Sequence, residues 1–90
     1  MGELVIVREP TPNPNAMKFT ANRPLNNGPT KTFYNAEAAQ ADPVAAELFA
    51  LEGVTGVMLL GDFCSVNKTG QADWGELASR IENVLREAYQ

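Results

Sequence analysis

Residues 54–68 read VTGVMLLGDFCSVNK, in which two mainly apolar stretches flank the dipeptide Gly61-Asp62. A two-residue loop that begins with glycine is typical of a tight β-hairpin turn, because glycine tolerates the backbone angles that such turns require. The sequence therefore predicts two antiparallel strands, residues 54–60 and 63–68, that are joined directly by this turn.

The pairing across the turn decides which side chains share a face of the hairpin. Leu60 is predicted to lie opposite Phe63, and successive pairs then alternate between the two faces of the sheet. One face carries Val57, Leu59, Cys64 and Val66. All four are apolar, so we expect this face to pack against the core. The opposite face carries Met58, Leu60, Phe63 and Ser65.

Three further strands are predicted before the hairpin. Leu4–Val7 is an apolar, largely β-branched run too short for a helix, which indicates a buried strand. Residues 10–15, PTPNPN, predict a stiff turn that ends this strand, because proline fixes its own φ and asparagine can bond to nearby backbone groups. Ala16–Thr20 alternates apolar and polar side chains and is predicted to return antiparallel to the first strand. Residues 22–30 predict a surface loop, and Lys31–Tyr34 predict a short third strand.

Two helical segments are predicted between the third strand and the hairpin. Asn35 can cap one helical turn over residues 36–41. Asp42-Pro43 is a typical helix start for residues 44–52, and Gly53 stands where the end of a helix favours a positive φ.

A longer helix is predicted at the C-terminus. The tetrapeptide Asp73-Trp-Gly-Glu76 resembles a capping box at its start. Apolar residues then recur at helical spacing, namely Trp74, Leu77, Ala78, Ile81, Leu85 and Ala88.

These elements predict one α+β domain that spans residues 1–90. Its order is β-β-β-α-β-β-α, with an antiparallel or mixed five-stranded sheet and two helices on one face in a two-layer arrangement. Because two helices cover only one face, we expect the other face of the sheet to be partly open.

Composition and charge limit the classes of partner. The 90 residues carry a net charge of −4, and the seven Lys and Arg are scattered along the chain. Phosphate groups would be repelled, so we expect no nucleic-acid partner, and without a basic amphipathic stretch we expect no membrane partner. The sequence also lacks the pattern of a signal peptide, so we expect a cytoplasmic protein, and we expect it to be a monomer.

The side chains available for chemistry are few. The sequence has no histidine and a single cysteine, Cys64, so we expect no enzymatic activity and no bound cofactor. The predicted register places Cys64 in the core, where a free thiol behaves as a small hydrophobic group. The alternative is that Cys64 binds iron or an iron-sulfur cluster at a dimer or partner interface, because one chain alone has too few soft ligands for a metal.

Two groups of residues are candidates for binding a partner. Met58, Leu60 and Phe63 would form an apolar patch on the open face, which either binds a partner or is covered by a terminus or by self-association. Asn13, Asn15 and Lys18 lie in or beside the rigid turn. This turn is either a structural connection or a recognition surface whose rigidity lowers the entropic cost of binding.

Four stretches, in this order, resemble the N-terminal domain of Nfu-type (NifU-like) iron-sulfur scaffold proteins. They are TPNPNAMKF, DPVAAELFALEGV, VMLLGDFCSVNK and ADWGEL, and together they extend over nearly the whole chain. The resemblance implies a small α/β domain with an antiparallel sheet, which agrees with the order of elements predicted from the residues.

The resemblance also carries a functional expectation. In full-length members of the family a separate C-terminal domain with a CxxC motif holds the cluster, and these 90 residues contain no CxxC. The resemblance therefore implies a free-standing accessory module that binds an iron-sulfur assembly factor or a client apoprotein, and iron binding would apply only by association with the family. A cluster carrier that uses Cys64 and a small enzyme remain as alternatives.

Overall fold

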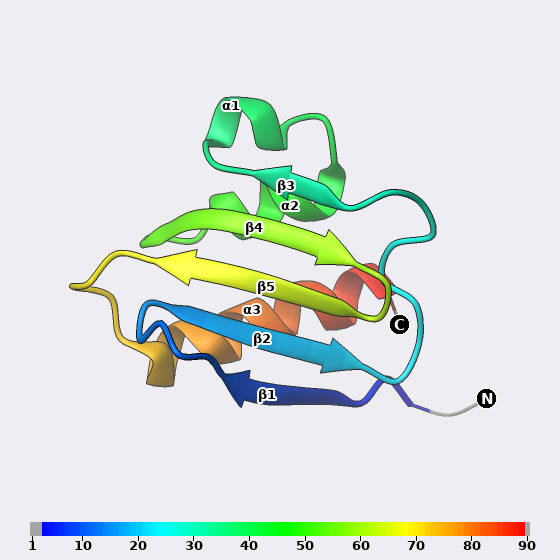
Figure 1. The fold of residues 1–90 in the computed structure, drawn as a ribbon, viewed down its shortest axis with the longest axis horizontal. Helices are drawn as coiled ribbons and strands as arrows, with labels where there is room; N and C mark the ends of the chain where they lie inside the picture. The colour runs from blue at the N-terminus through cyan, green and yellow to red at the C-terminus, as the bar shows by residue number, and fades with distance from the viewer. Residues whose placement is uncertain (1–2, 90) are drawn as a thin grey trace.

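The computed structural model describes residues 3–89 and shows one antiparallel sheet with its main helices on one side (Figure 1). The strands are β1 (Ile6–Pro10), β2 (Ala16–Ala21), β3 (Lys31–Phe33), β4 (Val54–Leu60) and β5 (Phe63–Lys68). The helices are α1 (Ala36–Ala39), α2 (Pro43–Phe49) and α3 (Trp74–Tyr89). The predicted α+β class, the antiparallel pairing and the order of the strands and the two longer helices are confirmed, and the helical turn predicted after Asn35 is the four-residue helix α1.

The predicted hairpin forms the middle of the sheet. The five strands lie in the order β1-β2-β5-β4-β3, and every neighbouring pair is antiparallel. Leu60 pairs with Phe63 and Leu59 with Cys64, as predicted. At the turn Gly61 has a φ of +58°, and no non-glycine residue from 3 to 89 has a positive φ. This combination matches a turn that needs glycine at its first central position.

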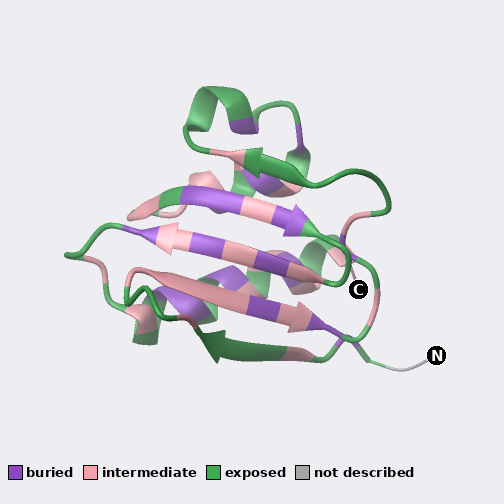
Figure 2. Ribbon diagram, in the orientation of Figure 1, coloured by how far each residue is buried: buried purple, intermediate pink, exposed green. Residues whose placement is uncertain are grey.

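The helices α2 and α3 cover one face of the sheet. In Figure 1 they lie behind the strands, with α3 behind β2 and β5 and α2 near β3 and β4. The core between the layers contains Phe19, Leu48, Val57, Leu59, Cys64, Val66, Ile81 and Leu85, all at most 2% exposed. Figure 2 shows the buried positions alternating along β5, and Val57 and Leu59 of β4, which pair with Val66 and Cys64, are buried as well. The face of the hairpin that was predicted to be apolar is therefore the core face.

Both predicted caps of the central helices are present. The Asn35 side chain accepts from the Ala38 N–H at 2.7 Å, and Asp42 Oδ1 accepts from the N–H groups of Val44 and Ala45. Burial acts to raise the pKa of Asp42, but the bonds from these N–H groups and from the Lys31 ammonium outweigh it, and the pKa is lowered. The carboxylate that caps α2 is therefore charged at neutral pH.

The first strand differs from its prediction. It runs from Ile6 to Pro10 at the edge of the sheet, and of the predicted Leu4–Val7 only Leu4 is buried, whereas Val5 and Val7 are 52% and 54% exposed. An apolar run indicates a strand but does not show whether other residues cover it. Val7 lies on the face of β1 turned away from the helices, where no described helix covers it. Proline has no backbone N–H to donate. Pro10 can still belong to β1 because this strand is at the edge of the sheet, where that missing donor removes no hydrogen bond from the sheet.

The loop 22–30 and the end of α3 close one end of the sheet. Leu25 is buried, and its N–H donates to the Gly61 carbonyl at 2.8 Å, so the loop packs on the hairpin turn. Tyr89 Oη donates to the Leu25 carbonyl at 2.9 Å. The predicted C-terminal helix is confirmed, but Ala88 is exposed and does not join the core.

Gly53, between α2 and β4, is where we expect the fold to tolerate substitution least among the glycines. Its φ is +99°, and a Cβ added there would lie 2.8 Å from the Ala72 Cβ. We expect Gly53→Ala to lower the free energy of unfolding by about 1–3 kcal/mol, because strain and overlap act together. Urea denaturation measures this change. Gly28→Ala is the control, since nothing lies within 4 Å of its added Cβ, and equal losses for the two variants would contradict the prediction.

Candidate functional site: the open face of the sheet

The candidate site is the sheet face turned away from α2 and α3. It is here called the open face and consists of Val7, Glu9, Lys18, Thr20, Thr32, Met58, Leu60, Phe63, Ser65 and Asn67. Strand register aligns Lys18, Ser65, Met58 and Thr32 in one row across four strands, because Ser65 pairs with both Lys18 and Met58, which in turn pairs with Thr32. This face is turned toward the viewer in Figure 1.

The apolar part of the open face is partly accessible to solvent. Leu60 is 38% exposed and Val7 is 54% exposed, while Met58 and Phe63 are half-buried. The structure therefore brings Met58, Leu60 and Phe63 together on one surface, as the hairpin register predicted, and the pairing of β2 with β5 adds Lys18 to it. Large side chains that remain accessible on a sheet face are typical of partner-binding surfaces.

Lys18 is held above an aromatic ring on this face. Its Nζ lies 4.4 Å from the centroid of the Phe63 ring, within the range of a cation–π contact. The neighbouring carboxylate of Glu9 accepts a hydrogen bond from the Thr20 hydroxyl at 3.0 Å. The Lys18 ammonium is thereby positioned without being neutralised by an ion pair.

A shallow hollow lies at the β3 side of the open face. Its volume is about 170 Å³, and it is lined by Thr32, Tyr34, Gly56, Val57, Met58, Ser65 and Asn67. Tyr34 is 74% exposed at its margin. Accessible tyrosine is common in protein interfaces. The sequence analysis did not propose Tyr34 as a binding residue. Its position directly after the strand Lys31–Phe33 was the feature that could have indicated this role.

The two asparagines of the Pro/Asn turn have structural partners. Asn13 Oδ1 accepts from the Asn15 N–H at 2.9 Å, which confirms the predicted local bond. Asn15 Oδ1 instead accepts from Lys68 Nζ at 3.1 Å, and the Asn15 carbonyl accepts from the Lys68 N–H at 2.8 Å. The turn is therefore hydrogen-bonded to the end of β5, and its two asparagines are not part of the open face.

Lys68 is a buried cation that sequence analysis missed. It is 9% exposed, and its Nζ also donates to the Thr69 carbonyl and lies 5.5 Å from the Trp74 ring centroid. Trp74 Nε1 in turn donates to the Pro14 carbonyl at 2.9 Å. The prolines, the asparagines and this lysine thus form one polar connection among the turn, β5 and the start of α3.

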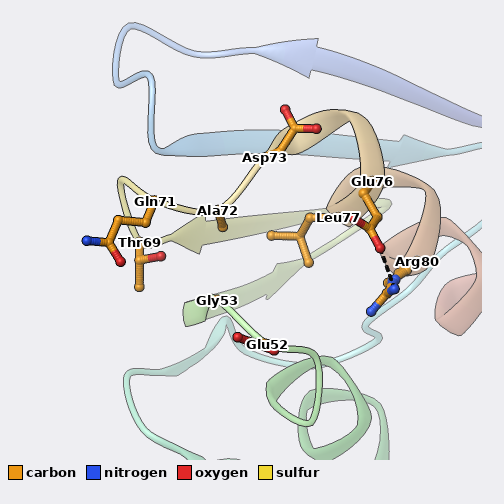
Figure 3. A pocket seen from close by; sticks show the side chains of 9 residues that line it. All are labelled: Glu52, Gly53, Thr69, Gln71, Ala72, Asp73, Glu76, Leu77 and Arg80. Atoms are coloured by element: carbon orange, nitrogen blue, oxygen red, sulfur yellow. Dashed lines mark hydrogen bonds and ion pairs between the residues drawn. The ribbon is translucent and has the colours of Figure 1, made fainter.

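A second hollow, of about 440 Å³, lies on the helix side between Gly53 and the beginning of α3 (Figure 3). Its lining is mainly polar, and Glu76 and Arg80 pair within it along one helix face. Glu52 and Asp73 lie at other parts of its wall. Within residues 3–89 no three His, Cys, Asp or Glu side chains are grouped as metal ligands would be.

Cys64 faces the helices from the middle of β5 and is 0% exposed. Burial raises the pKa of its thiol to about 12. A thiol is a metal ligand and a nucleophile as the thiolate, so this environment opposes both roles. The predicted placement of Cys64 in the core is confirmed.

Residues 6–90 match the family model described as "Scaffold protein Nfu/NifU N terminal". The chain belongs to this family. The resemblance seen in the sequence motifs is confirmed.

Curated relatives of this Nfu N-terminal chain are much longer than it is. NifU-like protein 5, mitochondrial, from Arabidopsis thaliana is 30% identical over 96% of this chain and 31% of the relative. The NFU1 iron-sulfur cluster scaffold homolog, mitochondrial, from Drosophila grimshawi is 33% identical over 93% of this chain and 28% of the relative. The chain therefore spans about a third of the length of these proteins.

Solved structures share the fold. A NifU-like protein from Saccharomyces cerevisiae matches 98% of this chain and 82% of the solved chain, with a TM-score of 0.84 and 25% identity. Protein SAV1430 from Staphylococcus aureus matches 93% of this chain and 99% of its own, with a TM-score of 0.76 and 25% identity. No helix among residues 3–89 is long and apolar enough to cross a bilayer.

The structural role of the Pro/Asn turn leads to a stability prediction. Asn15→Ala removes an acceptor from the buried Lys68 ammonium, and we expect it to lower the free energy of unfolding by about 1–3 kcal/mol. Asn13→Ala removes one exposed local bond and should cost less, about 0.5–1 kcal/mol. Urea denaturation of both variants tests the order, and an Asn13 variant that is the less stable of the two would contradict it.

The burial of Cys64 leads to a prediction about thiol reactivity. A maleimide or disulfide reagent should label the folded protein slowly and the urea-unfolded protein fast, because the reacting thiolate is scarce and inaccessible in the fold. At pH values of about 7 and about 9 alike, the folded protein should be labelled much more slowly than the unfolded protein, whose thiol ionises near its usual pKa and is accessible. Fast labelling of folded protein would show that Cys64 is accessible and would favour a ligand role.

Proposed function

We propose that this Nfu N-terminal domain is an accessory protein-binding module of iron-sulfur cluster assembly or delivery and that its open face binds the partner. The observation that carries the proposal is the uncovered sheet face on which Lys18, Met58, Leu60 and Phe63 gather. The partner would be an assembly factor or a client apoprotein.

Family membership supports the link to iron-sulfur proteins. The matching family is named for a scaffold, and the Drosophila relatives are named iron-sulfur cluster scaffold homologs. Because the matched part is about a third of those proteins, we propose for it the recruiting role and not the holding of a cluster. The proposal includes that the domain works in the cytoplasm as a monomer and catalyses no reaction itself.

The chemistry of the open face favours a protein partner. Met58, Leu60 and Phe63 lie on the two central strands β4 and β5, and Thr20, Thr32 and Asn67 provide hydrogen-bonding groups beside them. A partly apolar centre with a polar margin is usual for protein interfaces. With a net charge of −4, the chain offers poor complementarity to nucleic acid.

No structural observation favours the carrier function of Cys64. The thiol is enclosed between β5 and the helix layer, and its raised pKa keeps it protonated near neutral pH. For Cys64 to bind a cluster at an interface, β5 would have to separate from the core. The binding-module function requires no such rearrangement.

Site-specific photo-crosslinking in cells tests the proposed function. A photoreactive residue at position 32, on the open face, should capture iron-sulfur assembly proteins or apoproteins that are identified by mass spectrometry. The control places the same residue at the exposed position 87 on α3. Capture of the same proteins from both positions, or of none connected with iron-sulfur clusters from position 32, would contradict the proposal.

Two variants sharpen this experiment. Leu60→Asp places a charge in the apolar part of the open face and should abolish capture from position 32 while changing stability by about 1 kcal/mol or less, because Leu60 is 38% exposed. Cys64→Ala should leave the captured proteins unchanged. Loss of capture in a folded Cys64→Ala protein would favour the carrier function.

A further inference from the structure

We propose that the partner segment bound by the open face carries an aspartate or glutamate beside apolar side chains and that Lys18 recognises this carboxylate. The inference rests on the proposed function, because it describes the partner of the same face. It adds the chemical class of the segment and the residue that selects it.

The first argument comes from the partners of the cations. The chain has seven Lys and Arg, and six of them contact oxygen atoms of the protein. Those six are Arg8, Arg23, Lys31, Lys68, Arg80 and Arg86. Lys18 differs from these six. Among residues 3–89 its ammonium contacts the face of the Phe63 ring and no oxygen atom. It is therefore the cation that remains available for an external anion.

The second argument is the way in which Lys18 is held. An ammonium 4.4 Å above an aromatic ring loses conformational freedom before a partner arrives, while its N–H groups can still donate to an oxygen. A pre-positioned cation makes binding less costly in entropy. Glu9, its pairing partner on β1, accepts a hydrogen bond from the Thr20 hydroxyl and forms no ion pair with Lys18 in the described structure.

The third argument is the surrounding surface. On one side Lys18 lies in a row with the uncharged residues Ser65, Met58 and Thr32, and on its other side the row ends at Glu9, whose carboxylate bonds to the Thr20 hydroxyl. A partner that covers this row removes water from Lys18, and an uncompensated buried ammonium would oppose binding. A carboxylate on the partner satisfies the charge, and its apolar neighbours can cover Met58 and Phe63. The hydrogen bond to a charged donor would also be stronger than a neutral one.

The spacing of the site limits the geometry of the segment. Lys18 and Met58 lie on β2 and β4 with β5 between them, so their backbones are about 10 Å apart. Two turns of a helix, or three residues of an extended chain, span about this distance. The acidic residue and its apolar anchor can therefore come from one short segment.

Peptide selection tests the inference with a defined probe. A random peptide library displayed on phage is selected against the immobilised wild-type protein, with Leu60→Asp protein used to remove binders of other surfaces. Enriched peptides are then synthesised, and their dissociation constants are measured by fluorescence anisotropy at low and high salt. We expect the enriched sequences to combine Asp or Glu with large apolar residues and to bind more weakly at high salt.

Two charge-matched variants identify the cation responsible. Lys18→Gln should weaken the selected peptides about tenfold, the size expected for a hydrogen bond to a charged group. Arg80→Gln makes the same change of charge on α3, where Arg80 pairs with Glu76, and should leave affinity within about twofold. Similar losses in both variants, or no loss in Lys18→Gln, would overturn the inference.

The remaining outcomes distinguish this inference from the proposed function. If crosslinking from position 32 captures iron-sulfur proteins but their capture persists in Lys18→Gln, the function stands and the carboxylate inference fails. Enriched peptides without acidic residues also overturn the inference. Sedimentation that shows a dimer dissociated by Leu60→Asp would assign the face to a second copy of the chain, and both the function and the inference would fail.

Discussion

The structure depends on the register of the central hairpin. In this register Leu59 pairs with Cys64 and Val57 pairs with Val66. The side chains of these four residues lie in the core, and the alternate side chains lie on the open face. A shift by one residue would exchange the two sets, burying Ser65 and exposing the core residues. The turn at Gly61 and the loop that packs on it prevent such a shift, because Leu25 and Asn26 both donate to the Gly61 carbonyl.

The buried ammonium of Lys68 provides a second constraint at the opposite end of the sheet. A charge at 9% exposure needs compensating contacts, and the Asn15 side chain, the Thr69 carbonyl and the Trp74 ring provide them. This requirement explains why the Pro/Asn turn is rigid. The turn bonds to Lys68 through Asn15 and to Trp74 at the start of α3 through the Pro14 carbonyl.

Much of the fold could be predicted because its signals are local. Glycine at the hairpin turn, Asp42 before Pro43 and the alternation in Ala16–Thr20 each depend on neighbouring residues, and the structure agrees with all three. Two features could not be predicted in this way. The exposure of Val5 and Val7 depends on which strand is at the edge, and the bond between Asn15 and Lys68 joins residues 53 positions apart.

The candidate site was predictable to a similar degree. Sequence periodicity placed Met58, Leu60 and Phe63 on one face, but the contact between Lys18 and Phe63 requires the pairing of β2 with β5, which sequence does not reveal. Asn13 and Asn15 could not be assigned from sequence for the same reason. Their polarity suggested that they bind a partner, but in the structure their side chains form hydrogen bonds that stabilise the turn.

The separation of the two faces has a consequence for how this domain can change. Core residues are constrained by packing against α2 and α3, whereas on the open face Leu60 is exposed and Lys18 is only half-buried, so both contribute less to stability. Substitutions on the open face can therefore change the chemistry of this surface without unfolding the sheet. Lys18 illustrates this independence, because its backbone belongs to β2 while its ammonium is held only by the Phe63 ring among the contacts recorded for residues 3–89. A domain built in this way can keep one fold while a few side chains of its open face change.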